Sequence, residues 1–101
     1  MNTEQLIAET KARFNHNAQK AQLKDKYQSK LIFAHSNGMW TASPELISIL
    51  NNYSSSTIIL IDDYENPVQV DVVKLLNKTI QVYESVMKQY LAEWQELENK
   101  R

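Results

Sequence analysis

The chain has 101 residues, of which 43% are hydrophobic and 23% charged, and its formal net charge is −1. That length corresponds to one domain with a modest core, and the composition is that of a chain that folds. Because the sequence contains no cysteine and one glycine, disulfide frameworks, thiolate nucleophiles, cysteine metal sites and glycine-rich phosphate loops are excluded.

The N-terminal thirty residues are rich in alanine, glutamine, lysine and glutamate and contain neither glycine nor proline. These residue types predict a helix over about 4–28, with Thr3 as its N-cap. Apolar residues are sparse in it, although Ile7, Phe14 and Ala21 recur by sevens. We expect this helix to need a neighbour for its stability.

Two short apolar runs on either side of the Asn-Gly pair at 37–38 predict a β-hairpin. Asn-Gly is preferred in a two-residue type I′ turn because both central residues take positive φ. In this register His35 lies opposite Trp40, and Phe33 lies opposite Ala42.

A short helix and a second hairpin are expected next. Ser43 is a typical N-cap, and Pro44 suits the first helical position because its missing N–H costs nothing there. The continuously apolar segment 57–61 predicts a strand covered on both faces. The turn-rich residues 62–67 and the segment 68–70 complete the predicted hairpin.

Asp71 is the expected N-cap of a final helix that continues without glycine or proline to about Asn99. The order predicts an α+β fold: two β-hairpins that form a small antiparallel sheet with a short helix, plus long N- and C-terminal helices that pack antiparallel. A single domain is expected over residues 1–101. Its parts are an N-terminal helix at 1–30, a ββαββ-type head at 31–71 and a long C-terminal helix at 72–100.

The last helix carries the clearest pattern in the sequence. Its apolar residues alternate by threes and fours without a gap, as the a and d positions of a coiled coil do. They are Val73, Leu76, Ile80, Tyr83, Met87, Tyr90, Trp94 and Leu97. For residues 72–91 a second explanation stays open, in which the helix lies on its own head. Beyond Leu91, Trp94 and Leu97 are expected to outreach the head and to require cover from the first helix, a second copy of the chain or a different protein.

These features favour a non-enzymatic protein–protein interaction or assembly module. Tyrosine and tryptophan are bulky for a two-stranded zipper, so a mixed helical bundle in a homodimer or higher oligomer is expected. The predicted oligomer interface consists of Ile7, Phe14, Met87, Tyr90, Trp94 and Leu97. His35, Trp40 and Tyr64 are the predicted surface for a further, unknown protein partner.

The sequence offers no candidate catalytic or metal-binding residues. His16 and His35 fall in different elements, without the companions of a metal site or a hydrolytic triad. Four carboxylates near the second turn lack the spacing of a calcium-binding loop, and a solvated acidic hairpin is favoured. They are Asp62, Asp63, Glu65 and Asp71. We therefore expect no enzyme activity, no cofactor and no metal.

The alternative function is that of a nucleic-acid-associated accessory factor that uses the basic N-terminal helix. Its candidate residues are Lys11, Arg13, Lys20 and Lys24. The first thirty residues hold six Lys/Arg against three Asp/Glu, but these charges are spread around the helix, which favours a solvated surface. No stretch approaches a membrane span and no signal peptide is recognisable, so we expect a cytoplasmic protein with no membrane partner.

Three segments of the chain resemble small proteins of T4-like tailed bacteriophages. They are Asn37-Gly38-Met39-Trp40-x-x-Ser43-Pro44-Glu45-Leu46-Ile47, Asp62-Asp63-Tyr64-x-Asn66-Pro67-Val68, and the stretch from Tyr83 to Trp94. The similarity covers residues 36–98 and rests on no catalytic motif. It implies a phage product in the host cytoplasm, acting in virion assembly or on a host or replication protein. The N-terminal helix departs from the pattern, so its role is not carried over.

Overall fold

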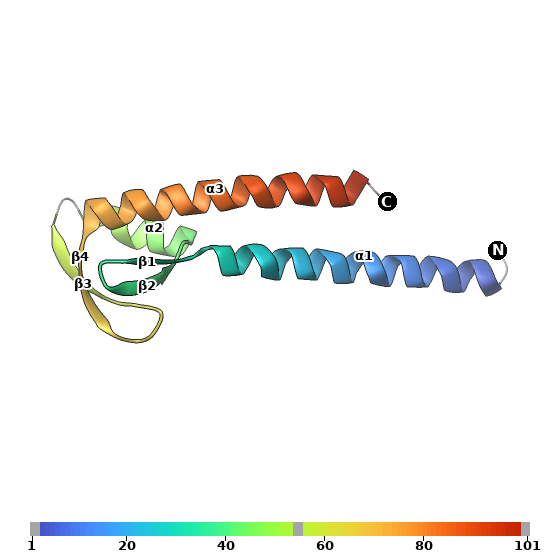
Figure 1. The fold of residues 1–101 in the computed structure, drawn as a ribbon, viewed down its shortest axis with the longest axis horizontal. Helices are drawn as coiled ribbons and strands as arrows, with labels where there is room; N and C mark the ends of the chain where they lie inside the picture. The colour runs from blue at the N-terminus through green and yellow to red at the C-terminus, as the bar shows by residue number, and fades with distance from the viewer. Residues whose placement is uncertain (1–2, 54–55, 100–101) are drawn as a thin grey trace.

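The computed structural model describes residues 3–53 and 56–99, apart from the side chains of two residues, Ala12 and Phe14. Its elements are α1 (Thr3–Lys30), β1 (Ile32–His35), β2 (Gly38–Thr41), α2 (Pro44–Asn51), β3 (Thr57–Ile61), β4 (Pro67–Asp71) and α3 (Val72–Asn99). The predicted α+β fold and its element order are confirmed. The molecule measures 66 × 24 × 19 Å, because the two long helices leave a small head side by side as a stalk (Figure 1).

The two hairpins form separate two-stranded antiparallel sheets within the described residues. They are joined at one point instead of by a continuous ladder. Asp63 N–H donates to Met39 O at 2.8 Å, and Met39 N–H donates to Asp62 Oδ2 at 3.0 Å. Thr41 Oγ1 also donates to Asp63 Oδ2 at 2.6 Å. The two small sheets of the head are therefore linked by hydrogen bonds around Asp62 and Asp63.

The first hairpin turns one residue earlier than the sequence predicted. Phe33 lies opposite Trp40, and the turn consists of Ser36 and Asn37, whose φ angles are 53° and 66°. Gly38 belongs to β2, where an added Cβ would lie 3.1 Å from the Trp40 indole. The glycine thus accommodates the close approach of the ring, and its φ is not positive.

The prediction that β3 is covered on both faces is wrong. Its side chains alternate: Ile58 and Leu60 are half-buried, whereas Ile59 and Ile61 are 70% and 63% exposed. The core lies on one side of this hairpin only, so the opposite face of the strand has no layer to cover it.

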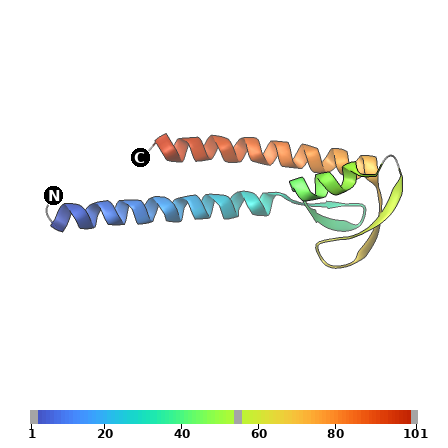
Figure 2. The ribbon, with the colours of Figure 1, turned by 180° about the vertical axis from the view of Figure 1, so that it is seen from behind.

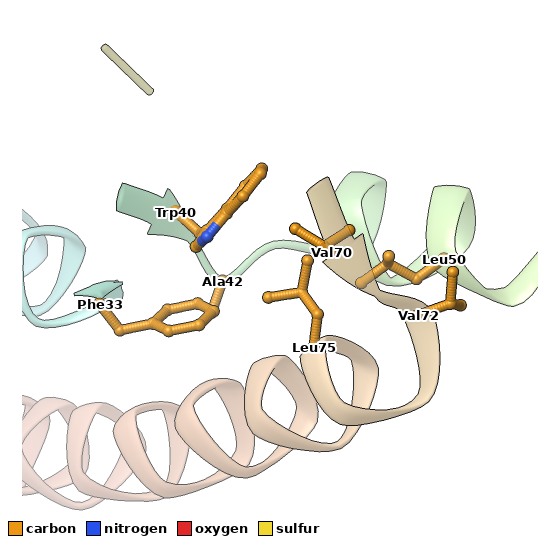
Figure 3. Packing of buried hydrophobic residues seen from close by; sticks show 7 residues of the cluster. All are labelled: Phe33, Trp40, Ala42, Leu50, Val70, Val72 and Leu75. Atoms are coloured by element: carbon orange, nitrogen blue, oxygen red, sulfur yellow. The ribbon is translucent and has the colours of Figure 1, made fainter. Parts of the chain in front are cut away.

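The hydrophobic core lies where the hairpins, α2 and the first turn of α3 meet. Its buried residues are Phe33, Trp40, Ala42, Leu50, Val70, Val72 and Leu75 (Figure 3). Both predicted helix caps around this core are confirmed. Ser43 Oγ accepts the N–H of Leu46 at 3.1 Å, and Asp71 Oδ1 accepts the N–H of Lys74 at 3.1 Å. The caps satisfy backbone donors that the helix itself leaves unpaired.

α3 packs on the head through a stripe beside the predicted heptad stripe. Its buried residues are Val72, Leu75, Thr79 and Val86. Their spacing is also by threes and fours, except that the position expected between Thr79 and Val86 is half-buried. Val73, the first predicted heptad residue, is 48% exposed. The explanation in which this helix lies on its own head therefore holds for its first half. None of the helices in the described part of the chain is long and apolar enough to cross a membrane.

α1 outruns α3 at the free end of the stalk. Its contacts with α3 end where His16 Nε2 lies 3.2 Å from Glu98 Oε1, one residue before the end of α3. Residues 3–15 of α1 continue past the described end of α3 (Figure 2). At 1.5 Å per residue this overhang is about 20 Å long.

Candidate interaction surfaces

The two stalk helices are clasped by four side chains. Tyr27 is 2% exposed and stacks on Tyr90, with ring centroids 5.3 Å apart and an interplanar angle of 3°. The Tyr27 hydroxyl donates to the Glu93 carboxylate, which also accepts two hydrogen bonds from Lys26 Nζ at 2.9 and 3.1 Å. We call Lys26, Tyr27, Tyr90 and Glu93 the clasp.

Electrostatics in the clasp follow from these hydrogen bonds. The Lys26 ammonium, and after it the Tyr27 hydroxyl, holds the pKa of Glu93 below its usual value, because both stabilise the charged carboxylate. The same carboxylate raises the pKa of Tyr27 and of Lys26 by hydrogen bonding to their protonated forms. At neutral pH the clasp is therefore a charge-assisted contact.

A second contact lies nearer the free end. Lys20 Nζ is 2.7 Å from Glu98 Oε1 and 5.7 Å from the centre of the Trp94 ring. Trp94 nevertheless remains 39% exposed, so α1 covers only part of the indole. Leu97 is half-buried on the other side of the stalk, where it lines a depression together with Leu23.

An apolar groove runs along one side of the stalk. Two adjoining hollows of about 370 and 250 Å³ share Met87 and Tyr90 in their linings. The first lies between α1, α3 and the segment 41–44, and the second extends along α3 to Leu91 and Trp94. We call their combined lining the stalk groove. The structure thus brings three predicted interface residues, Met87, Tyr90 and Trp94, into one open surface.

The predicted interface residues of the N-terminal helix lie apart from this surface. Ile7 is 50% exposed on the overhang, and the side chain of Phe14 lies outside the described residues. α1 meets α3 through His16, Lys20 and Tyr27. At about 100° per residue Ile7 is about half a turn around the helix from that face. Within one chain it cannot meet the C-terminal end of α3.

The predicted partner surface on the head is corrected by the structure. Trp40 is 3% exposed, and its Nε1–H donates to His35 O at 2.9 Å, so its side chain belongs to the core. His35 lies opposite Gly38 and is half-buried, with its Nδ1 2.8 Å from Ser36 Oγ. Tyr64, in the second turn, is 69% exposed and is the one of the three that a partner can readily reach.

The four basic residues proposed for nucleic-acid contact do not form one free surface. Lys11 and Arg13 are exposed on the overhang. Lys20 is paired with Glu98, and Lys24 lines the stalk groove. Part of the positive charge of α1 is therefore used in contacts within the chain.

The structure assigns Asp62 a role that the sequence analysis missed. Its side chain is 6% exposed and accepts N–H groups from Asn66, Met39 and Tyr64 at 2.9 to 3.0 Å. These bonds, that from Asn66 first, lower the pKa of the carboxyl group. Asp62 is thus a buried residue that fixes the second turn and links it to the first hairpin. The sequence signal for this role was the position of Asp62 at the start of a turn, where aspartate side chains often accept backbone N–H groups.

A metal site and a match to known proteins would each indicate a function. Within residues 3–53 and 56–99, no three His, Asp or Glu side chains converge as a metal site would require. Comparison with protein-family models, curated proteins and solved structures found no match to the chain. The function must therefore be argued from the surfaces themselves.

Proposed function

We propose that the protein is a non-enzymatic assembly module that forms a homodimer by exchanging the overhang of α1 between two stalks. The observation that carries the proposal is a mismatch along the stalk. Residues 3–15 of α1 extend past the described end of α3, while the stalk groove lies open between the head and Trp94.

The dimensions of the two surfaces agree. The overhang is about 20 Å long, and the part of the groove between Tyr83 and Trp94 spans about 17 Å of helix. Leu6 and Ile7 are 56% and 50% exposed on the overhang, and Leu91 is 54% exposed in the groove. Each surface therefore offers apolar area that the other can bury.

A two-fold axis perpendicular to the stalk relates the two copies in this arrangement. The stalks then lie antiparallel, and each overhang completes a three-helix bundle with α1 and α3 of the other copy. Such an interface is closed, because each copy gives and receives the same segment.

The similarity of residues 36–98 to small phage proteins extends the proposal to a biological setting. A dimer with two acidic heads at opposite ends suits a connector in virion assembly within the host cytoplasm. This part rests on the resemblance alone, and the dimer is argued independently of it.

Replacement of Leu91 by glutamate tests the dimer directly. The wild-type chain of 11.8 kDa is expected to show twice that mass by light scattering at micromolar concentration. Leu91→Glu places a charge in the groove and is expected to give monomers. Val73→Glu is the matched control, since Val73 is 48% exposed on the same helix but outside the groove, and its dimer should persist. A wild-type monomer at all concentrations, or a dimer unaffected by Leu91→Glu, contradicts the proposal.

The exchange of overhangs has its own test, because the chain has no cysteine. Copies carrying Ile7→Cys are mixed with copies carrying Leu91→Cys and treated with a short thiol cross-linker. Exchange predicts the mixed product. If the overhangs instead pair with each other, Ile7→Cys alone gives the cross-linked species, and the exchange is wrong although the dimer stands.

A further inference from the structure

The hydrogen-bond pattern of the second hairpin shows which strand edge is open. At one end of the ladder Val72 N–H donates to Ser56 O at 3.1 Å, and at the other Asp62 N–H donates to Asn66 O at 3.0 Å. Bonds in an antiparallel pair recur at every second residue. The even-numbered residues of β3 therefore bond to β4, and the peptide groups of the odd-numbered residues point away from it.

The odd-numbered residues, Thr57, Ile59 and Ile61, form what we call the outer edge of β3. The N–H and C=O groups of these residues, which are every second residue of the strand, point away from β4. The edge of any strand that can accept a further strand has this arrangement. The side chains of the same residues share the uncovered face, where Ile59 and Ile61 are 70% and 63% exposed. Within the described part of the chain, the outer edge thus combines unpaired backbone groups with apolar side chains.

β4 differs from β3 in the protection of its edge. Its outward residues are Pro67, Gln69 and Asp71, the cross-strand partners of the odd-numbered residues of β3. Proline has no N–H to offer, and a charged residue disfavours strand addition. The outer edge of β3 contains neither, so one hairpin carries one blocked edge and one open edge.

A pocket adjoins the open edge. β2 touches the edge at its end, where Asp63 N–H donates to Met39 O. Beyond this contact a hollow of about 260 Å³ lies between the hairpins and α2, and Ile49, Ile61 and Glu45 are among its lining residues. A strand laid along β3 would pass this hollow and could place a side chain in it.

The charge of the head restricts the partner. Residues 31–71 contain five Asp or Glu and no Lys or Arg, and Glu45 and Asp63 both line the pocket. A second copy of β3 would bring an equally acidic head against this one, which like-charge repulsion opposes. A cationic segment is attracted instead.

We propose that the outer edge of β3 binds an extended segment of a partner protein in which apolar and cationic side chains alternate. Backbone hydrogen bonds to Thr57, Ile59 and Ile61 hold the segment, and the adjoining pocket selects a side chain, as in other cases of strand addition. A lysine or arginine near the pocket meets Glu45 and Asp63 with its stem on apolar residues. This site lies at the end of the molecule opposite the overhang (Figure 1) and does not depend on the dimer.

Amide hydrogen exchange of the full chain tests whether the edge is open. The N–H groups of Ile59 and Ile61 should exchange at least about tenfold faster than those of Ile58 and Leu60, which are bonded to β4. Equal protection of all four amides means that the edge is already covered, and overturns the proposal. Protection that rises with protein concentration identifies a second copy as the occupant and overturns the choice of partner.

Binding is tested with a seven-residue peptide in which lysine alternates with valine, measured by the anisotropy of a label on the peptide. Two further peptides carry N-methyl groups on all lysine amides or on all valine amides. Strand addition uses one of these two sets, so one methylated peptide should bind at least about tenfold more weakly and the other about as well as the parent. Equal binding of both shows plain attraction to the acidic head and overturns the proposal.

Two protein variants provide the matched control. Ile59→Lys adds a charge to the outer edge and should weaken binding of the peptide at least about tenfold. Gln69→Lys adds the same charge at the cross-strand partner on the blocked edge and should leave binding within about twofold of wild type. Equal weakening by both assigns the effect to charge alone and overturns strand addition, and the circular dichroism of each variant establishes that it is folded.

Discussion

The head and the stalk of this protein reach stability by different means. The head closes a small core on itself: Leu50 and Leu75 are fully buried, and Asp62 satisfies three N–H groups at the link between hairpins. In the stalk, by contrast, Tyr27 is the one residue of α1 that is buried among those whose exposure is described. Leu91 and Trp94 on α3 remain 54% and 39% exposed.

The two long helices show what this difference means. Each has 28 residues, and neither contains a glycine or a proline. α3 is anchored because its first half shares the core of the head. α1 is anchored mainly at the clasp and at Glu98, and continues past both. Helix length is thus a local property here, whereas helix anchoring depends on what the rest of the chain supplies.

The largest expected effect is the loss of the core contact that joins α3 to the head. Leu75→Ala should lower the free energy of unfolding by about 2–5 kcal/mol, through lost burial and the cavity it leaves. Val73→Ala, at an exposed position of the same helix, should change it by less than about 1 kcal/mol. Denaturant unfolding measures both, and similar losses would show that the head is not the main source of stability.

A smaller effect confined to the head is expected at the first turn. Gly38→Ala should cost about 1–3 kcal/mol, because the new methyl group meets the Trp40 indole. Ser36→Gly should be neutral or stabilise by up to about 1 kcal/mol, because Ser36 has positive φ. A clear loss of stability in Ser36→Gly would instead support the register that the sequence suggested, in which Ser36 lies before the turn.

Replacement of Glu93 should loosen the stalk and leave the head intact. Glu93→Gln weakens the bonds from Lys26 and Tyr27, so amides of α1 near the clasp should exchange faster while those of β1 and β2 stay protected. Glu96→Gln, an exposed position on the same helix, is the control and should change little. If protection falls equally in head and stalk, the two parts unfold as one unit and the contrast between them is lost.

The smallest effects are expected from acid. The folded-state pKa values of Asp62 and Glu93 both lie below their usual values. Each carboxylate therefore contributes stability that is complete above its usual pKa and is lost as the pH falls through the folded value. The melting temperature should decline below about pH 4.5, the usual pKa of glutamate. Asp62→Asn should flatten this decline, whereas the exposed neighbour Glu65→Gln should not.

Local signals in the sequence were enough to place most elements. The absence of glycine and proline predicted the ends of the long helices to within about two residues of the observed ends. Ser43 and Asp71 marked the starts of α2 and α3, because a capping side chain and the helix it caps are neighbours along the chain. The acidic turn and the order of elements were likewise read from adjacent residues. All of these features depend on interactions over a few positions.

Tertiary contacts decided the rest. The register of the first hairpin depends on the Trp40 ring lying over Gly38, and the exposed face of β3 depends on where the core ends. The choice between two neighbouring stripes of α3, the burial of Asp62 and the overhang of α1 depend on how far each element reaches past the others. The spacing of apolar residues along one helix or strand is compatible with either register or either face. Only the packing of distant segments selects between them.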